Sequence, residues 1–165
     1  YYVQQPINEN LRFWGRQTLK AFGVKSRFVH LEFFQLGRAH RGLGNEGDFV
    51  ALEVNMRPGG GYTPDMINYA HNVDVYQIWA DMVAFDQRRQ PDTNDDYFCV
   101  YAGRRSGVEY HLNDAQILDK YAYAMKMTPN IDKALAPAMG DYAYVARFRT
   151  EWERDEFLYD VCNRK

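Results

Sequence analysis

Cysteines, long apolar runs and an excess of one charge sign are all scarce in this sequence. The two cysteines, Cys99 and Cys162, have neither the number nor the spacing of a disulfide framework or a zinc site. No apolar run approaches the roughly 18 residues that a membrane-spanning helix needs, and no secretory signal pattern opens the chain. We therefore expect a cytoplasmic protein with reduced thiols and no membrane partner.

The charges are nearly balanced, because 20 Lys and Arg face 22 Asp and Glu for a formal net charge of −2. A general nucleic-acid binder carries a basic field, so we expect no nucleic-acid partner. With 46% apolar and 25% charged residues the chain is globular, and 165 residues suffice for one domain or two small ones. It begins at Tyr1 without methionine, inside an extended segment over 1–6, so we expect it to belong to a longer protein.

The spacing of apolar residues predicts an α+β protein with two parts. Residues 87–96 are polar and contain a proline, so they mark the boundary between domains 1–90 and 91–165. In the first domain we expect a helix, two strands and two helices, at 8–22, 26–36, 48–55, 64–71 and 74–86. In the second we expect strands at 97–104, 108–112, 122–127 and 141–149, and helices at 113–120, 129–139 and 151–163.

Local signals also predict helix starts and side-chain burial. Three positions are typical of helix N-termini: Asn113, Thr128 before Pro129, and Thr150 with Glu153 three residues later. Aromatic residues make up 16% of the chain, and we expect most of them in the core, including Trp14, Trp79 and Trp152. The arginines at predicted strand ends are expected in solvent rather than at a carboxylate site: Arg104, Arg105, Arg147 and Arg149.

The first pair of predicted strands carries the most informative polar residues. Side chains alternate between the two faces of a strand. His30 and Glu32 therefore share a face of the first strand, opposite to Val29, Leu31 and Phe33. In the second strand Glu53 and Asn55 share a face with Ala51, while Val50, Leu52 and Val54 face the other way. If the strands pair as a hairpin, both glutamates and Asn55 converge on one surface.

Two carboxylates and an amide oxygen are ligands that suit Mg²⁺, which takes further ligands from water and nucleotide phosphates. Arg57 follows Asn55 by two residues and can hold a phosphate or carboxylate. Alternation alone favours a simpler interpretation, an ordinary solvated sheet face, because exposed acids on amphipathic strands are common. The Glu-x-Asn-x-Arg run that enters a triple glycine at 59–61 favours a metal–phosphate site instead.

Three segments in order carry a family resemblance: HLEFF, ALEVNMRPGGGYTPDM and NVDVYQIWADMV. Together they resemble the carboxy-terminal half of an ATP-grasp domain, as in biotin carboxylase, the large subunit of carbamoyl phosphate synthetase and glycinamide ribonucleotide synthetase. The resemblance covers about residues 8–86. It implies a C-terminal ATP-grasp subdomain, with an antiparallel sheet and flanking helices, over 1–90. A small α/β extension follows over 91–165.

The resemblance also implies roles for individual residues. Glu32 and Glu53 would bind Mg²⁺ ions on the phosphates of ATP, and Asn55 would be a third metal ligand. Arg57 would be catalytic, by steadying the transferred phosphoryl group. The loop glycines would let the nucleotide and substrate approach the backbone: Gly59, Gly60 and Gly61. The implied activity is that of an ATP-dependent ligase, which joins a small-molecule carboxylate to an amine, or to a thiol, through an acyl phosphate.

The upstream half of an ATP-grasp site has no counterpart in this sequence. That half supplies a phosphate-contacting lysine, a flexible loop and an adenine-binding hinge. Lys20 and Lys25 lie immediately before the first acidic strand, too late to be that lysine. We therefore expect this chain alone to be inactive and to bind Mg-ATP weakly. The alternative is a non-catalytic interaction or dimerisation module over 97–165, with a second copy of the chain as partner.

Overall fold

The computed structural model describes residues 1–3 and 6–165. The chain forms two compact units. The hairpin unit comprises Pro6–Pro64 and Tyr76–Gln90, and the three-stranded unit comprises Tyr1–Gln5, Asp65–Val75 and Pro91–Lys165. A division thus falls between residues 90 and 91, and Asp65–Val75 groups with the later residues. Of the extended segment predicted over 1–6, residues 4 and 5 lie outside the described residues.

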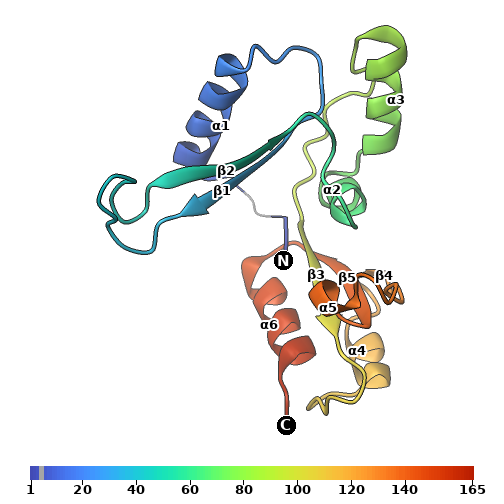
Figure 1. The fold of residues 1–165 in the computed structure, drawn as a ribbon. Helices are drawn as coiled ribbons and strands as arrows, with labels where there is room; N and C mark the ends of the chain where they lie inside the picture. Colours follow the sequence, from blue (N-terminus) through green and yellow to red (C-terminus); the bar gives the residue numbers. More distant parts are fainter. Residues whose placement is uncertain (4–5) are drawn as a thin grey trace. The chain divides into compact units, whose positions relative to one another are not determined.

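In the hairpin unit, a helix lies against a two-stranded antiparallel sheet (Figure 1). The helix α1 (Glu9–Ala21) is capped by Asn8, whose side-chain oxygen accepts hydrogen bonds from the backbone N–H groups of Asn10 and Leu11. The sheet pairs β1 (His30–Gln35) with β2 (Phe49–Asn55). A Cβ on Gly15 of α1 would lie 3.7 Å from Cδ1 of Leu31, so this helix covers the Leu31 face of β1.

The hairpin unit encloses no large hydrophobic side chain completely among the residues described here. Trp14 is 49% exposed and Trp79, in α3 (Val75–Phe85), is 45% exposed. The expectation that these tryptophans belong to a core is therefore wrong, as it is for Trp152 in the other unit, which is 71% exposed. Two strands and neighbouring helices have too little area to surround a side chain of that size.

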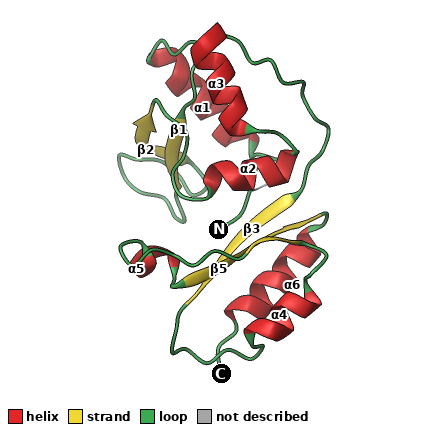
Figure 2. Cartoon of the chain, turned by 90° about the vertical axis from the view of Figure 1, so that its right-hand side faces the viewer, coloured by secondary structure: helices red, strands yellow, loops and turns green. Residues whose placement is uncertain are grey.

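The three-stranded unit has a continuous core. Its antiparallel sheet has the order β3 (Phe98–Arg104), β5 (Tyr142–Phe148) and β4 (Met125–Met127). The helices α4 (Asp114–Lys120) and α6 (Glu151–Cys162) lie on one side of it (Figure 2). Buried side chains from these helices, the sheet and the residues that follow α4 form one cluster: Val100, Ala102, Ile117, Tyr121, Ala124, Tyr144, Ala146, Phe148, Phe157 and Val161.

Two of the three predicted helix starts in this unit are confirmed, and the start predicted at Thr128 is wrong, because the next helix begins only at Ala136. Asn113 and Gln116 form a reciprocal capping box at the start of α4, and Thr150 and Glu153 form another at the start of α6. Each box pairs backbone N–H groups that a helix start would otherwise leave without partners. The short helix α2 (Thr63–His71) begins at Thr63 and Pro64, and a proline is well tolerated at the start of a helix.

Three predicted elements are shorter than expected. The strand predicted over 122–127 is reduced to β4 (Met125–Met127), because residues 121–124 form a turn. Residues 108–112 form only an isolated bridge, from Tyr110 to Arg164, because the residues that follow α6 offer no strand for a longer ladder. The helix predicted over 129–139 is reduced to α5 (Ala136–Met139). Pro137 lies at the start of α5, where its missing N–H is tolerated, and would break a helix that passed through it. Gly140 ends α5 with a φ of 91°.

The strand-end arginines have different environments. Arg104 is 1% exposed, so the expectation of solvation is wrong there. Its guanidinium donates to the carbonyl oxygens of Val161 and Asp160 and to Oδ1 of Asp114. Residues on two helices, α4 and α6, therefore satisfy a charge that would otherwise be costly to bury. Arg105 and Arg149 are exposed, and the guanidiniums of Arg147 and Arg149 stack on the ring of Tyr97.

No helix in the described parts of the chain has the length and apolar character needed to cross a membrane.

Candidate functional site

The hairpin brings the two predicted metal-binding glutamates face to face. In the register of β1 and β2, Glu32 is the direct partner of Glu53, so their side chains leave the sheet on the same face. The Glu32 side chain is 40% exposed, and Glu53 is exposed. The Leu31–Val54 pair takes the other face, where α1 lies. The acidic face is therefore turned away from α1 and open to a ligand.

On the acidic face, the pair that neighbours the two glutamates is Asn55, at the end of β2, and His30, at the start of β1. They lie on the same face as the two glutamates, because residues two apart in a strand share a face. The imidazole Nε2 of His30 is 3.5 Å from Oε1 of Glu32. His30 Nδ1 and Asn55 Nδ2 are buried, and neither has a hydrogen-bond partner among the described residues. The candidate site therefore consists of four polar side chains, from His30, Glu32, Glu53 and Asn55, and two of their buried nitrogen atoms lack a hydrogen-bond partner among the described residues.

A β-bulge interrupts the strict alternation predicted for the two strands. Glu32 pairs with Glu53, but Phe33 pairs with Ala51, and Leu52 has no partner in the register. Beyond this point Phe34 is the partner of Val50, where an uninterrupted register would have placed Gln35. The apolar face is consequently incomplete, and Phe34 and Leu52 are 59% and 56% exposed. Bulges often lie beside functional sites, where they redirect side chains.

The glycine loop after β2 makes contacts within itself. The Arg57 guanidinium donates to the carbonyl oxygen of Pro58 at 3.0 Å. No hydrogen bond or ion pair joins it to Glu32 or Glu53 within the described residues. The carbonyl oxygen of Gly60 accepts from the backbone N–H of Thr63, and Gly61 has a φ of 59°. The structure thus brings the two glutamates and Asn55 together, while Arg57 and the glycines stay in the adjoining loop.

The oxygen donors of this set fit a hard divalent cation. Among the described residues, no group of three or more His, Cys, Asp or Glu side chains has the geometry to hold a metal ion. Two carboxylates and an amide would leave most positions of an octahedral Mg²⁺ to water and phosphate oxygens, which is how this ion is usually bound. The residues present therefore fit Mg²⁺ on a phosphate ligand better than a cage made only of protein groups.

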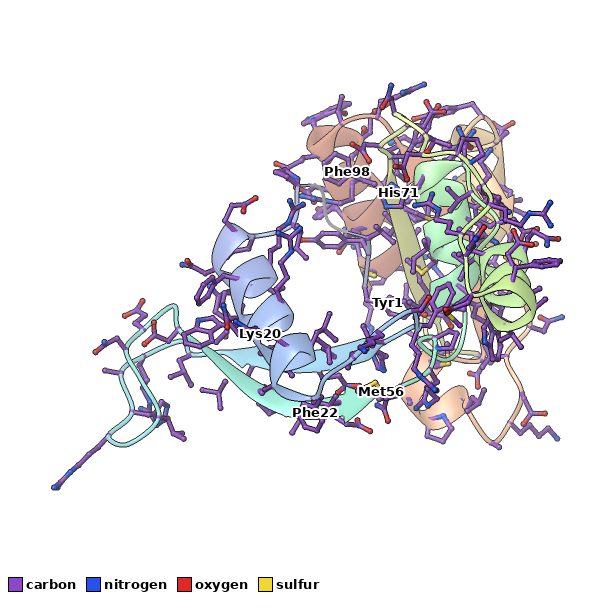
Figure 3. All side chains as sticks on the ribbon, turned by 90° about the horizontal axis from the view of Figure 1, so that it is seen from above. Tyr1, Lys20, Phe22, Met56, His71 and Phe98 are labelled. Atoms are coloured by element: carbon purple, nitrogen blue, oxygen red, sulfur yellow. The ribbon has the colours of Figure 1, made fainter. Side chains whose placement is uncertain are left out.

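A cavity of about 360 Å³ lies in the hairpin unit, and neither the two glutamates nor Asn55 lines it. Phe22, which follows α1, and Met56, which directly follows Asn55, contribute to its walls (Figure 3). Lys25 and Arg27 also line the cavity, so its surroundings combine apolar surface with positive charge. Such a lining suits an anionic ligand that has an apolar part.

His30 is the residue whose role the sequence left undefined. Alternation placed it on the acidic face, but its proximity to Glu32 and its register with Asn55 depend on the pairing of the two strands. The only sequence signal was its position two residues before Glu32.

Neither a protein-family model nor a curated protein matches the sequence. Among solved structures, phosphoribosylglycinamide synthetase from Anaerococcus prevotii matches with a TM-score of 0.57 and 10% sequence identity. The match covers 99% of this chain and 43% of that chain, so this chain spans less than half the length of its structural neighbour. At this identity the likeness concerns the fold alone. The chain has a mixed α/β fold, with antiparallel sheets and flanking helices, like the matched part of that structure.

Proposed function

We propose that this chain supplies the Mg²⁺–phosphate side of the ATP site in an ATP-dependent ligase. The observation that carries the proposal is the direct opposition of Glu32 and Glu53 across the hairpin. Like charges in that position destabilise a sheet, and a bound cation would remove the repulsion. The structural neighbour, phosphoribosylglycinamide synthetase, supports the proposal at the level of the fold.

Each residue of the site has a distinct part in this proposal. Glu32, Glu53 and the Asn55 amide oxygen would hold Mg²⁺, which neutralises charge on the phosphates when it is bound. Arg57 would leave its contact with the Pro58 carbonyl and donate to the transferred phosphoryl group, because a guanidinium binds phosphate oxygens in a bidentate manner. The backbone of Gly59, Gly60 and Gly61 would admit the nucleotide and the substrate closely.

The proposed reaction has two steps. A carboxylate oxygen of the first substrate attacks the γ-phosphorus of ATP, the bond to the bridging oxygen breaks, and ADP leaves. The product is an acyl phosphate. An amine, or a thiol, then attacks the carbonyl carbon and expels inorganic phosphate. The residues named above would contribute to the first step by positioning and by stabilising charge on the phosphoryl group.

Paramagnetic Mn²⁺ is a direct probe of the proposed metal site in the 165-residue chain. Mn²⁺ takes the same oxygen ligands as Mg²⁺ and broadens the NMR signals of nearby nuclei. We expect titration with Mn²⁺ to broaden the amide signals at the Glu32 and Glu53 pair first, and excess Mg²⁺ to reverse the effect. Glu53→Gln should abolish the selective broadening. Glu46→Gln, an exposed glutamate in the hairpin loop, is the matched control and should leave it unchanged.

The catalytic part of the proposal needs the whole protein that contains this chain. There Glu53→Ala should abolish the carboxylate-dependent release of phosphate from ATP, while Glu46→Ala should keep it. Unchanged turnover in the Glu53 variant would refute the proposed role. Broadening by Mn²⁺ that is uniform over the surface of the chain would refute the metal site itself.

A second candidate function is an interaction module in the three-stranded unit. The observation in its favour is that Trp152 and Tyr159, two turns apart on α6, are 71% and 67% exposed. Residues at this spacing share a face of a helix, and aromatic side chains are enriched at protein interfaces. Light scattering would test for a homodimer. Trp152→Ala with Tyr159→Ala should convert a dimer to a monomer, and a monomeric wild-type chain would remove this candidate.

A further inference from the structure

His30 lies between two of the three proposed metal ligands. Its Nε2 is 3.5 Å from Oε1 of Glu32, which is within ion-pair range but longer than a good hydrogen bond. Across the hairpin its register partner is Asn55. The second ring nitrogen, Nδ1, is buried and has no partner among the described residues. The ring therefore has one nitrogen toward Glu32 and one that remains to be satisfied.

The unsatisfied atom of Asn55 is chemically complementary to that of His30. A neutral imidazole that presents the N–H of Nε2 to the Glu32 carboxylate has an acceptor at Nδ1. The Asn55 Nδ2 group is a donor, and it too is buried without a partner among the described residues. Side chains directly opposite in an antiparallel pair have Cβ atoms about 4.5–5.5 Å apart. Modest side-chain rotations can therefore join the two atoms.

That contact would decide which way the Asn55 amide points. An asparagine side chain presents either its oxygen or its nitrogen, and only the oxygen can bind a cation. With Nδ2 held by His30, Oδ1 is left for the metal. In metal sites, partners that fix the orientation of a ligand commonly alter metal affinity by about 10- to 100-fold.

We propose that His30 is a positioning residue, which bridges Glu32 and Asn55 across the hairpin and fixes the Asn55 amide with its oxygen toward the metal. This inference rests on the proposed function for its consequence, although the contact between His30 and Asn55 can be measured without any metal. His30 itself does not bind the ion in this arrangement, because both of its nitrogens are engaged by protein side chains.

The contact is tested first in the metal-free chain by NMR. The Asn55 side-chain amide signal is identified by its loss in Asn55→Asp. We expect this amide to exchange its hydrogens more slowly than exposed asparagine amides, and His30→Phe to remove the protection. His30→Asn keeps a polar atom near the position of Nδ1 and should restore part of it. His30→Gln, which mimics Nε2, should not. Equal exchange in the wild type and in His30→Phe would overturn the inference.

The consequence for the metal is tested by titration of the same variants with Mn²⁺. We expect His30→Phe to raise the Mn²⁺ concentration for half-maximal broadening at Glu53 by about 10-fold or more. In an Asn55→Ala background the same change should have little further effect, because coupled residues act non-additively. Additive effects of the two changes would overturn the inference. A wild-type chain without selective broadening would instead contradict the proposed function, and the exchange experiment would still report on the contact.

Discussion

Glu32 and Glu53 are direct partners in the antiparallel pair of β1 and β2, so two carboxylates share one face of a two-stranded sheet. Neither glutamate forms an ion pair with a lysine or arginine among the described residues, and Glu32 has only His30 within ion-pair distance. The arrangement is unfavourable for the hairpin by itself. Proteins often keep such local costs at functional sites.

Removal of one charge should stabilise the hairpin in the absence of metal. We expect Glu53→Gln to raise the free energy of unfolding of the hairpin unit by about 0.2–1 kcal/mol, because it relieves cross-strand repulsion. Urea denaturation followed by tryptophan fluorescence measures this in a Trp152→Phe background, where both remaining tryptophans, Trp14 and Trp79, belong to the hairpin unit. Added salt should shrink the difference. A destabilised Glu53→Gln, with Glu46→Gln neutral, would contradict the prediction.

The buried Arg104 should be important for the stability of the three-stranded unit. Arg104→Met keeps the length of the side chain but removes hydrogen bonds to Asp114 and to the carbonyl oxygens of Val161 and Asp160. We expect the free energy of unfolding to fall by about 2–3 kcal/mol. This is below the range for a fully buried ion pair, because Asp114 is half exposed. Urea denaturation followed by Trp152 fluorescence, with Trp14 and Trp79 replaced by Phe, reports on this unit.

Arg105→Met is the matched control for this experiment. The Arg105 guanidinium is exposed and donates to the carbonyl oxygens of Ala136 and Pro137. Water can replace those bonds, so we expect a loss below about 1 kcal/mol. Equal losses for Arg104→Met and Arg105→Met would show that burial of Arg104 contributes nothing.

Asp114 should make the three-stranded unit less stable as the pH falls into the acid range. Partial burial raises the pKa of this carboxyl, but hydrogen bonds from Tyr144, Arg104 and Tyr142 outweigh burial and hold the pKa below its ordinary value of 3.8. A lowered pKa stabilises the fold above the pKa of the unfolded chain, and this contribution is lost as the pH falls through the folded pKa. We expect the urea midpoint to fall between pH 5 and pH 2.5, and to fall less in Asp114→Asn.

The comparison for this prediction is Asp119→Asn, which makes the same charge change on the same helix, α4. An acid-induced fall in midpoint that is as large in Asp114→Asn as in the wild type would contradict the role of Asp114.

The two cysteines should differ sharply in reactivity. Cys99 is fully buried in β3, and burial raises the pKa of its thiol to about 12 despite the nearby charges of Arg147 and Lys126. Cys162 is exposed at the end of α6. The thiolate is the reactive form of a cysteine. A disulfide reagent at pH 8 should therefore modify Cys162 rapidly, and Cys99 only when the protein unfolds. Cys162→Ser should remove the rapid phase, and rapid modification of Cys99 would contradict the burial.

Local features of the fold could be predicted from the sequence. The capping boxes at Asn113 and Thr150, and the hairpin of β1 and β2, follow from patterns a few residues long. The alternation rule likewise placed Glu53 and Asn55 on one face of their strand, and the register of the hairpin then put Glu32 on that same face. Their metal-binding role, and the roles of Arg57 and the three glycines, remain predictions.

The sequence by itself determined the α+β class, the hairpin and the polar face, because backbone hydrogen bonding and side-chain alternation are local. Only the tertiary structure decided which residues meet across the chain. It placed the bulge at Leu52, paired Glu32 with Glu53 and His30 with Asn55, and buried Arg104 among Asp114, Asp160 and Val161. Burial and register depend on contacts between residues that are distant in sequence. Patterns of neighbouring residues do not identify which distant residue makes each contact.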